Sequence, residues 1–320
     1  MPVTIAFHGG AGTVTGSRFE AVAAGHHILV DCGLFQGLKE LRLRNWAPPA
    51  FDPSAIEAVF LTHAHIDHSG YLPRLVREGF RGPIHATRPT LELATILLLD
   101  AAKLQQEDAE YANQKGFSKH RPALPLFHER DARAAIARMK ASAYGKAIEA
   151  GPFRARFRQA GHILGSAFVE LEATVGQRTT RIVFSGDIGR VDRPLHVDPD
   201  PLPACDTLVL ESTYGDRLHD RRPLAEQIAG PFRKTIERGG TILIPAFAVA
   251  RAQLVTLLLR ELMEARELPQ IPIHIDSPMA TDVTGIYDQY LGTGHLDPVA
   301  KGRTQLFPRH VQFHRTVRQS

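Results

Sequence analysis

Runs of apolar residues divide the first part of the chain into short predicted strands and helices. Residues 3–9, 17–25 and 26–33 are short apolar or alternating segments that predict strands, and a tight Ala-Gly turn separates the last two. The apolar run at 55–63 predicts a further strand. Residues 69–79 have the apolar spacing of a helix and end at a glycine, so a unit of strand, loop and helix is predicted here.

Longer segments follow in the middle of the chain. Residues 82–87 predict a strand, 89–116 a long helix whose second half is polar, and 129–140 a further helix. We therefore expect a β-sheet with helices on its outer face. Strand-forming segments with turn residues between them then return at 144–162, 165–174 and 180–187.

The pattern changes in the last third of the chain, where strands alternate with helices. A strand predicted at 239–247 precedes a helix at 248–268, and a strand at 271–278 precedes a helix at 279–291. Such alternation is typical of βαβ units and a parallel sheet. The sequence therefore predicts an α/β protein with two domains, residues 1–205 and residues 206–320.

Composition indicates a globular protein. The 320 residues are 43% hydrophobic and 22% charged, and the two cysteines, Cys32 and Cys205, form no disulfide framework. The apolar runs are too short to span a bilayer, and the N-terminus lacks the features of a signal peptide. These observations predict a cytoplasmic protein that does not associate with a membrane.

The charge is mildly basic and spread along the chain. The formal charge is +4, the pI is near 9.2, and no run of five basic residues occurs, which is typical of a solvated surface. Of the 38 basic residues, 30 are arginine, which binds phosphate through a planar fork. Codon bias gives the same excess, so charge alone does not indicate a nucleic-acid partner.

The sequence "LTHAHIDHSG" at 61–70 places three histidines and an aspartate within six positions. Residues two apart on a strand point to the same side, so His63 and His65 are expected to converge. Asp67 and His68 follow where the strand turns into a helix and can face a second point. Imidazole and carboxylate are ligands for zinc, manganese, iron or cobalt. The alternative is a polar loop with surface histidines, but such a loop need not lie where an apolar strand ends.

Two further candidate ligands come later in the chain. His162 lies in "QAGHILGSA" between a strand and a turn bounded by glycine, and Asp187 follows the apolar strand in "IVFSGDIGR". Each has an ordinary explanation when taken alone, as a surface histidine or a turn aspartate. The order of these segments along the chain is more specific than any one of them.

These motifs resemble the metallo-β-lactamase superfamily, and the resemblance extends over residues 3 to about 315. The family's first motif matches Asp31 in "LVDCG". "LVLESTYGDRLH", which contains Glu211, together with "IPAFAVARAQ", "IDSPMA" and "GGAGTVTGS", is similar to the β-CASP branch of RNA- and DNA-processing nucleases. The resemblance implies a metallo-β-lactamase αββα sandwich followed by a partial β-CASP domain. The other family motifs match His63, His65, Asp67, His68, His162 and Asp187.

The resemblance also implies a role for each residue. Two Zn²⁺ ions are expected, and Asp187 would bridge them. Asp67 would hold the proton of the nucleophile, and Glu211 would orient a catalytic histidine further along the chain. Arg251 and Ser277 are candidate phosphate contacts. The first ion would bind His63, His65 and His162, and the second Asp67 and His68.

Asp31 has two possible roles. As a carboxylate behind a metal-bound imidazole it would fix the ring's orientation. The alternative is a turn residue that follows a strand.

The implied function is metal-dependent hydrolysis of single-stranded RNA, with a possible homodimer. Members of this branch usually continue for about another hundred residues with two more histidine motifs, so we expect this chain to be C-terminally truncated and its activity to be impaired. Two alternatives stay open: an inactive or weakly active RNA-binding scaffold, and a metallo-hydrolase of a small ester.

Overall fold

The chain forms two compact units in a computed structural model that describes residues 2–220, 222–297, 306 and 311–315. The first unit comprises Met1–Arg190 and Asp198–Thr213, and the second comprises Val191–Val197 and Tyr214–Ser320. The chain therefore passes between the units three times. The domain boundary predicted between 205 and 206 lies within the segment that returns to the first unit.

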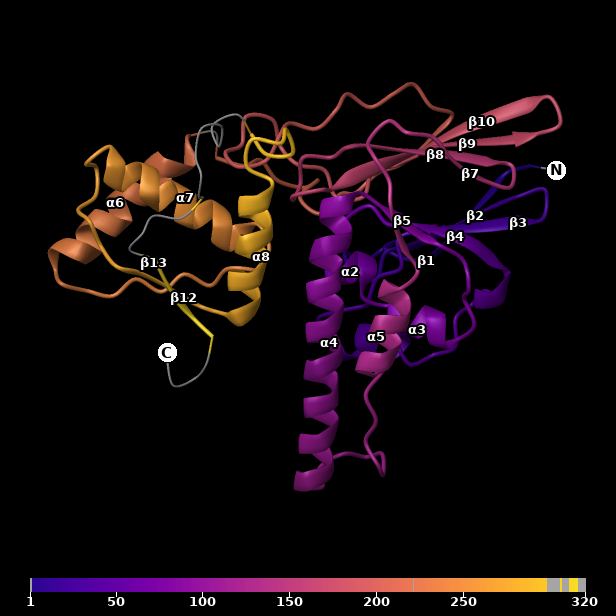
Figure 1. The fold of residues 1–320 in the computed structure, drawn as a ribbon, viewed down its shortest axis with the longest axis horizontal. Helices are drawn as coiled ribbons and strands as arrows, with labels where there is room; N and C mark the ends of the chain where they lie inside the picture. Colours follow the sequence, from indigo (N-terminus) through magenta and orange to yellow (C-terminus); the bar gives the residue numbers. More distant parts are fainter. Residues whose placement is uncertain (1, 221, 298–305, 307–310, 316–320) are drawn as a thin grey trace. The chain divides into compact units, whose positions relative to one another are not determined.

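Two β-sheets make up most of the first unit (Figure 1). The six-stranded sheet is antiparallel from β1 to β3 and parallel from β3 to β6. The five-stranded sheet has the order β11-β10-β9-β8-β7 and is antiparallel except between β10 and β11. The strands of the first sheet are β1 (Thr4–Gly9), β2 (Arg18–Ala23), β3 (His26–Val30), β4 (Ile56–Phe60), β5 (Ile84–Ala86) and β6 (Met139–Ala141). Those of the second are β7 (Ile148–Ala150), β8 (Phe153–Gln159), β9 (Ala167–Val175), β10 (Arg178–Phe184) and β11 (Thr207–Val209).

The main hydrophobic core lies between the two sheets. Alternate residues of β8, among them Phe153 and Phe157, are buried against Leu171 of β9 and Phe60 of β4. The residues between them face the other side, where the Arg158 Nε donates to a carboxylate oxygen of Glu170 at 3.0 Å. A period of two along β8 thus separates an apolar face from a charged one.

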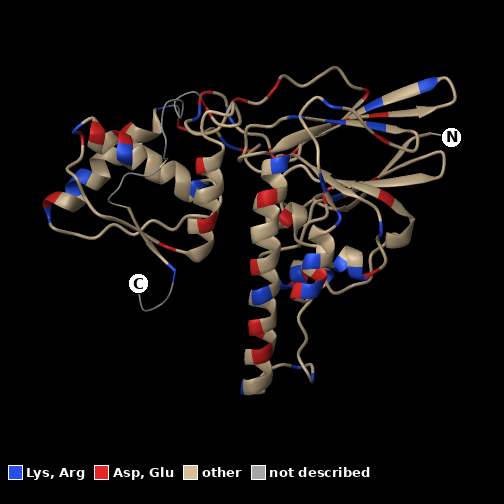
Figure 2. Cartoon of the chain, viewed as in Figure 1, with Lys and Arg blue, Asp and Glu red and all other residues tan. Residues whose placement is uncertain are grey.

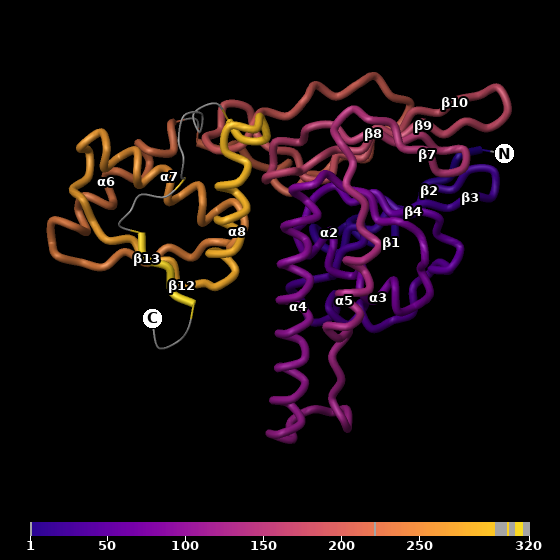
Figure 3. The backbone as a smooth tube through the Cα atoms, viewed as in Figure 1, coloured from indigo at the N-terminus to yellow at the C-terminus, as the bar shows by residue number. Residues whose placement is uncertain are grey.

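Helices cover the face of the first sheet that points away from the second sheet (Figure 1). The helix α3 (Leu72–Arg77) packs on α5 (Glu129–Ile136), which also contacts α4 (Arg88–Lys115). Figure 3 follows the backbone from the end of α4 back to α5. Together with the two facing sheets, this layer confirms the mixed α/β fold class. Three short helices complete the unit: α1 (Lys39–Arg44), η1 (Pro53–Ala55) and α2 (Ile66–Ser69).

The long helix α4 has clear signals at both ends. The Thr87 side chain accepts a hydrogen bond from the Thr90 N–H, and Gly116 ends the helix in the left-handed conformation. Figure 2 shows both acidic and basic residues along it. Lys103 Nζ lies 3.8 Å from a carboxylate oxygen of Glu107, one turn further on. The helix therefore presents a mixed-charge surface to solvent.

The second unit contains three helices and a two-stranded parallel ladder within its described residues. Its helices α6 (Leu224–Glu237) and α7 (Arg251–Glu264) pack around a small apolar cluster that includes Leu262 and Met263. His196 Nε2 lies 3.1 Å from the Tyr287 hydroxyl, and both residues are buried, so the segment 191–197 is anchored in this unit. No described helix is both long and apolar enough to span a membrane. The remaining elements are β12 (Ile273–Asp276), α8 (Pro278–Gln289) and β13 (Val311–His314).

Two predicted elements are wrong. The helix predicted at 129–140 ends at Ile136, because residues 139–141 form β6 and pair with β5, so tertiary pairing overrides the helical spacing. Residues 239–247 are not a strand. Leu243, Ile244 and Phe247 are exposed, Leu243 at 87%, and among the described residues this segment has no ladder partner to satisfy its backbone.

The burial of Leu171 between the sheets leads to a stability prediction. We expect Leu171→Ala to lower the free energy of unfolding by about 2–5 kcal/mol, because it leaves a cavity in a closely packed core. Urea denaturation followed by circular dichroism measures this change. The matched control is Leu104→Ala on α4, where the leucine is 52% exposed and the expected change is within about 0.5 kcal/mol. Equal losses in the two variants would contradict the placement of the core.

Candidate metal centre

The adjacent ends of β3 and β4 fix the start of the histidine-rich loop. The Asp31 N–H donates to the Phe60 carbonyl at 3.0 Å. The Asp31 carboxylate then accepts two hydrogen bonds from Thr62, from its N–H at 2.7 Å and from its hydroxyl at 2.8 Å. Thr62 precedes His63, so these contacts set the backbone position from which His63 projects.

The rest of the loop is held by backbone contacts to two other segments. The Ser17 N–H donates to the Asp67 carbonyl at 2.9 Å, and the Cys32 N–H donates to the His68 carbonyl at 2.7 Å. A Cβ atom at Gly33 would lie 1.6 Å from the Asp67 carbonyl oxygen, so only glycine permits this approach. Gly33 of "DCG" therefore serves to bring backbone against the loop.

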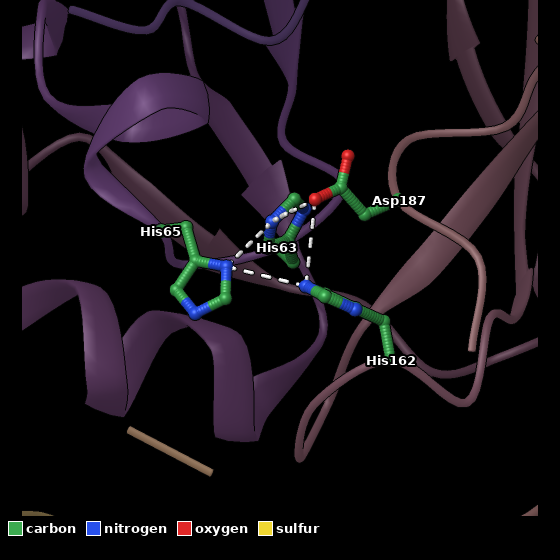
Figure 4. Close-up of side chains that lie close together, drawn as sticks. All are labelled: His63, His65, His162 and Asp187. Carbon is green, nitrogen blue, oxygen red and sulfur yellow. Dashed lines mark hydrogen bonds and ion pairs between the residues drawn. The ribbon is translucent and has the colours of Figure 1, made fainter. Parts of the chain in front are cut away.

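Four donor atoms meet at one point, as Figure 4 shows for His63, His65, His162 and Asp187. His65 Nδ1 lies 3.1 Å from His63 Nε2 and 3.3 Å from His162 Nε2. The Asp187 Oδ2 is 3.5 Å from His162 Nε2 and 3.8 Å from His63 Nε2. All four donor atoms lie within 4.8 Å of one another, which suits one metal ion.

A second group of donors adjoins the first through Asp187. Its other oxygen, Oδ1, lies 3.3 Å from His68 Nε2, and Asp67 Oδ2 lies 3.9 Å from the same nitrogen. One carboxylate thus presents one oxygen to each group. This division is what a carboxylate shared between two neighbouring ions requires.

Asp31 orients the ring of His68. Its Oδ2 lies 2.7 Å from His68 Nδ1, so that nitrogen is the protonated one that donates, and Nε2 is left to face Asp187. Asp31 is fully buried and has a left-handed backbone, with φ of 59°. The contact matches the role implied for Asp31 behind a metal-bound imidazole.

Burial and neighbouring charges shift the protonation of these groups. Burial lowers the pKa of His63 well below its ordinary value, with the neighbouring imidazoles adding to the effect, so the ring stays neutral. Burial raises the pKa of Asp187, but the hydrogen bond and charge of His68 outweigh it and hold that pKa below the ordinary range. At His68, burial lowers the pKa, and the carboxylates of Asp31 and Asp187 outweigh burial and raise it. A metal ion at Nε2 of His68 would displace the proton there.

A hollow of about 450 Å³ within the first unit borders the second donor group. His68 and Asp187 line it, next to Ser17, whose Oγ lies 3.5 Å from His68 Nε2. His68 and Asp187 are therefore accessible from an open space. Its apolar wall includes Ile5, Phe7, Phe19, Phe184, Leu208 and Leu210.

Three predicted site residues lie elsewhere or make other contacts. The Glu211 carboxylate accepts hydrogen bonds from the backbone N–H groups of Ile188 and Thr213. Arg251 begins α7, and the Ser277 Oγ caps α8 by accepting from the Ala280 N–H at 3.1 Å, both in the second unit. The roles expected for these three residues stay predictions.

Thr62 and Ser17 were not predicted as site residues. Thr62 links Asp31 to His63, and Ser17 contacts His68. Thr62 had one signal, its place immediately before the first histidine of the motif. Ser17 ends the stretch "GGAGTVTGS" that contributes to the family resemblance, but the stretch did not indicate a contact with His68.

A two-sheet sandwich with imidazoles and carboxylates at its strand ends is the arrangement of a metallo-β-lactamase-fold protein. The sequence model described as the metallo-beta-lactamase superfamily matches residues 20–228, more than half of the chain. The chain belongs to this superfamily.

Two relatives agree with the branch assigned from the sequence. Ribonuclease TTHA0252 of Thermus thermophilus is 41% identical over 282 residues, which cover 87% of this chain and 59% of that protein. Transcription termination factor FttA of Methanocaldococcus jannaschii is 31% identical over 296 residues, 90% of this chain and 44% of that protein. The β-CASP assignment is confirmed, and the chain spans about half the length of these relatives.

A solved structure of similar fold comes from Enterococcus faecalis and is titled as a protein of unknown function. The match has a TM-score of 0.51 at 14% identity, and it covers 98% of this chain and 76% of that one. At this identity the likeness shows the fold alone.

The convergence of the three histidines leads to a prediction about metal content. We expect His65→Ala to lower the zinc retained per chain, because it removes a nitrogen that lies within 3.3 Å of the other two. Elemental analysis after dialysis measures the stoichiometry. His120→Ala, at an exposed histidine outside the cluster, is the control and should retain wild-type zinc. Unchanged zinc in His65→Ala would count against the ligand assignment.

A second prediction tests Asp31. Asparagine tolerates the left-handed backbone as well as aspartate does, but its amide NH₂ cannot accept the hydrogen bond from His68 Nδ1. We expect Asp31→Asn to weaken zinc binding by about tenfold to a hundredfold. Competition with a chromophoric chelator measures the affinity. Wild-type affinity would indicate that Asp31 is only a turn residue.

Proposed function

We propose that this protein is a metal-dependent ribonuclease that hydrolyses phosphodiester bonds of single-stranded RNA. The observation that carries the proposal is the cluster of His63, His65, His162 and Asp187, whose donor atoms lie within 4.8 Å of one another. The 41% identity to a protein named as a ribonuclease supports RNA as the substrate. The metallo-β-lactamase fold supports hydrolysis as the reaction.

The donor set fits two zinc ions or another divalent first-row metal, because it combines imidazole nitrogens with carboxylate oxygens. We assign the first ion to the three histidines at positions 63, 65 and 162. Asp67 and His68 would hold the second, and Asp187 would contribute to both, since its two oxygens face the two groups. Such ions would supply a Lewis acid that lowers the pKa of water and would neutralise charge on a phosphate.

The chain's own residues prepare the site for this chemistry. Asp31 holds the His68 ring so that its Nε2 faces the site, and the buried backbone contacts around Gly33 keep the loop from moving. The carboxylate of Asp67 accepts the proton of the attacking water. His68, Asp67 and Asp187 would give the second ion three protein ligands and leave a position open for water or substrate, as in a catalytic zinc site.

Single-stranded RNA fits this site better than duplex, since its backbone can bend toward recessed ions. The hollow beside His68 and Asp187 offers one approach to them. We propose Arg251 and Ser277 as phosphate contacts of the second unit, where Arg251 begins one helix and Ser277 caps another.

Cleavage of labelled single-stranded RNA, with and without a chelator, tests the proposal. The wild-type chain should cleave with zinc or manganese present, and the chelator should abolish cleavage. Asp67→Asn should lower the rate about 10²- to 10⁴-fold, because it removes the proposed proton acceptor. The control, Asp108→Asn on the exposed face of α4, should cleave at the wild-type rate.

The outcomes separate the alternatives. Cleavage that survives the chelator would contradict the proposal. Bound metal and bound RNA without cleavage would indicate a scaffold. Hydrolysis of a small chromogenic ester but not of RNA would indicate a small-molecule hydrolase.

A further inference from the structure

The segment that carries Asp187 begins where the β10–β11 ladder stops. The ladder pairs Phe184 with Val209, and the Ser185 N–H makes one further bond, to the Val209 carbonyl at 2.9 Å. Beyond this point, side chains connect the segments that follow β10 and β11, and the ladder no longer does. The position of segment 186–188, which carries Asp187, therefore depends on hydrogen bonds made by these side chains.

Ser185 and Glu211 provide two successive links between the strand ends. The Ser185 Oγ accepts a hydrogen bond from the Glu211 N–H at 2.9 Å. The Glu211 carboxylate then accepts from the Ile188 N–H at 3.3 Å with one oxygen and from the Thr213 N–H at 2.9 Å with the other. The backbone amide that immediately follows Asp187 is thus tied to the end of β11.

The same segment is confined on two other sides. Gly186 has φ of 52°, and a Cβ there would lie 2.7 Å from the Thr62 Cβ. The Gly189 N–H donates to the Ala160 carbonyl at 2.7 Å, and a Cβ at Gly189 would lie 1.9 Å from the Gly161 carbonyl oxygen. Thr62 precedes His63, and Gly161 precedes His162. A shift of this segment would therefore move Asp187 relative to the histidines it faces.

We propose that Glu211, supported by Ser185, is a positioning residue that fixes Asp187 between the two donor groups. The inference rests on the proposed metal function and assigns Glu211 a partner other than the histidine that the family resemblance implies. Without the carboxylate, the Ile188 and Thr213 amides lose their acceptor, and only the contacts at Gly186 and Gly189 remain to hold Asp187 where it faces both His68 and His162.

Zinc affinity of the purified chain, measured by competition with a chromophoric chelator, tests this role. We expect Glu211→Ala to bind zinc about tenfold to a hundredfold more weakly than wild type. Glu211→Gln keeps the shape of the side chain but has only one acceptor oxygen. Its zinc affinity should therefore lie between those of wild type and Glu211→Ala. Ser212→Ala changes an exposed neighbour and should bind like wild type.

A double-mutant cycle separates positioning from a general structural effect. If Glu211 acts through Asp187, Glu211→Ala should cause no further loss of affinity in an Asp187→Ala background. Equal losses in both backgrounds would overturn the inference. So would Glu211→Ala or Glu211→Gln binding zinc as tightly as Ser212→Ala.

The zinc measurements also distinguish failure of the proposed metal function from failure of the Glu211 inference. A wild-type chain that binds no zinc would overturn both the metal function and this inference. A wild-type chain that binds zinc, with no effect of either Glu211 substitution, would overturn the positioning role alone. The melting temperature of each variant shows whether it is folded, and Glu211→Gln remains informative if Glu211→Ala does not fold.

Discussion

The buried carboxylate of Asp31 is the contact on which the arrangement of the site depends. It accepts hydrogen bonds from the Thr62 amide, the Thr62 hydroxyl and the His68 ring, all at 2.7 to 2.8 Å. A buried carboxylate without such partners would cost several kcal/mol, on the order of the stability of a small domain. Because its donors come from one loop, Asp31 ties that loop to the end of β3 and sets the direction of both His63 and His68.

The remaining donors arrive from the second sheet, and the packing of the two sheets brings them into place. His162 follows β8 and Asp187 follows β10, while the core between the sheets is filled by residues such as Phe60 and Phe157. The relative positions of the donor residues therefore depend on the packing of the core. Polar groups crowded together in this way are unfavourable unless they are paired or bind a cation, which is one reason to regard the cluster as a metal site.

The sequence predicted the fold class and the meeting of the donor residues, but not the details. His63 and His65 were expected to converge because they alternate on a strand. The strand ends at Phe60, and His65 stands at the N-terminus of α2, so the two rings converge through loop backbone that neighbouring segments hold. His65 presents Nδ1, whereas the other two histidines present Nε2. This difference depends on the loop backbone and cannot be predicted from the spacing.

His162 and Asp187 were recognised from the order of family motifs, since neither has a specific local pattern. The hydrogen bonds of Glu211 depend on where two strand ends stop pairing, which the sequence does not encode locally.

We propose that two metal ions lie side by side in this site, with Asp187 between them. The most direct measurement is a crystal structure of the zinc-loaded chain with an anomalous difference map at the zinc absorption edge. We expect two peaks, one at the three histidines 63, 65 and 162 and one at His68 and Asp67, with an Asp187 oxygen at each. Zinc bound at other positions, or no peak at these residues in a chain that carries zinc, would contradict it.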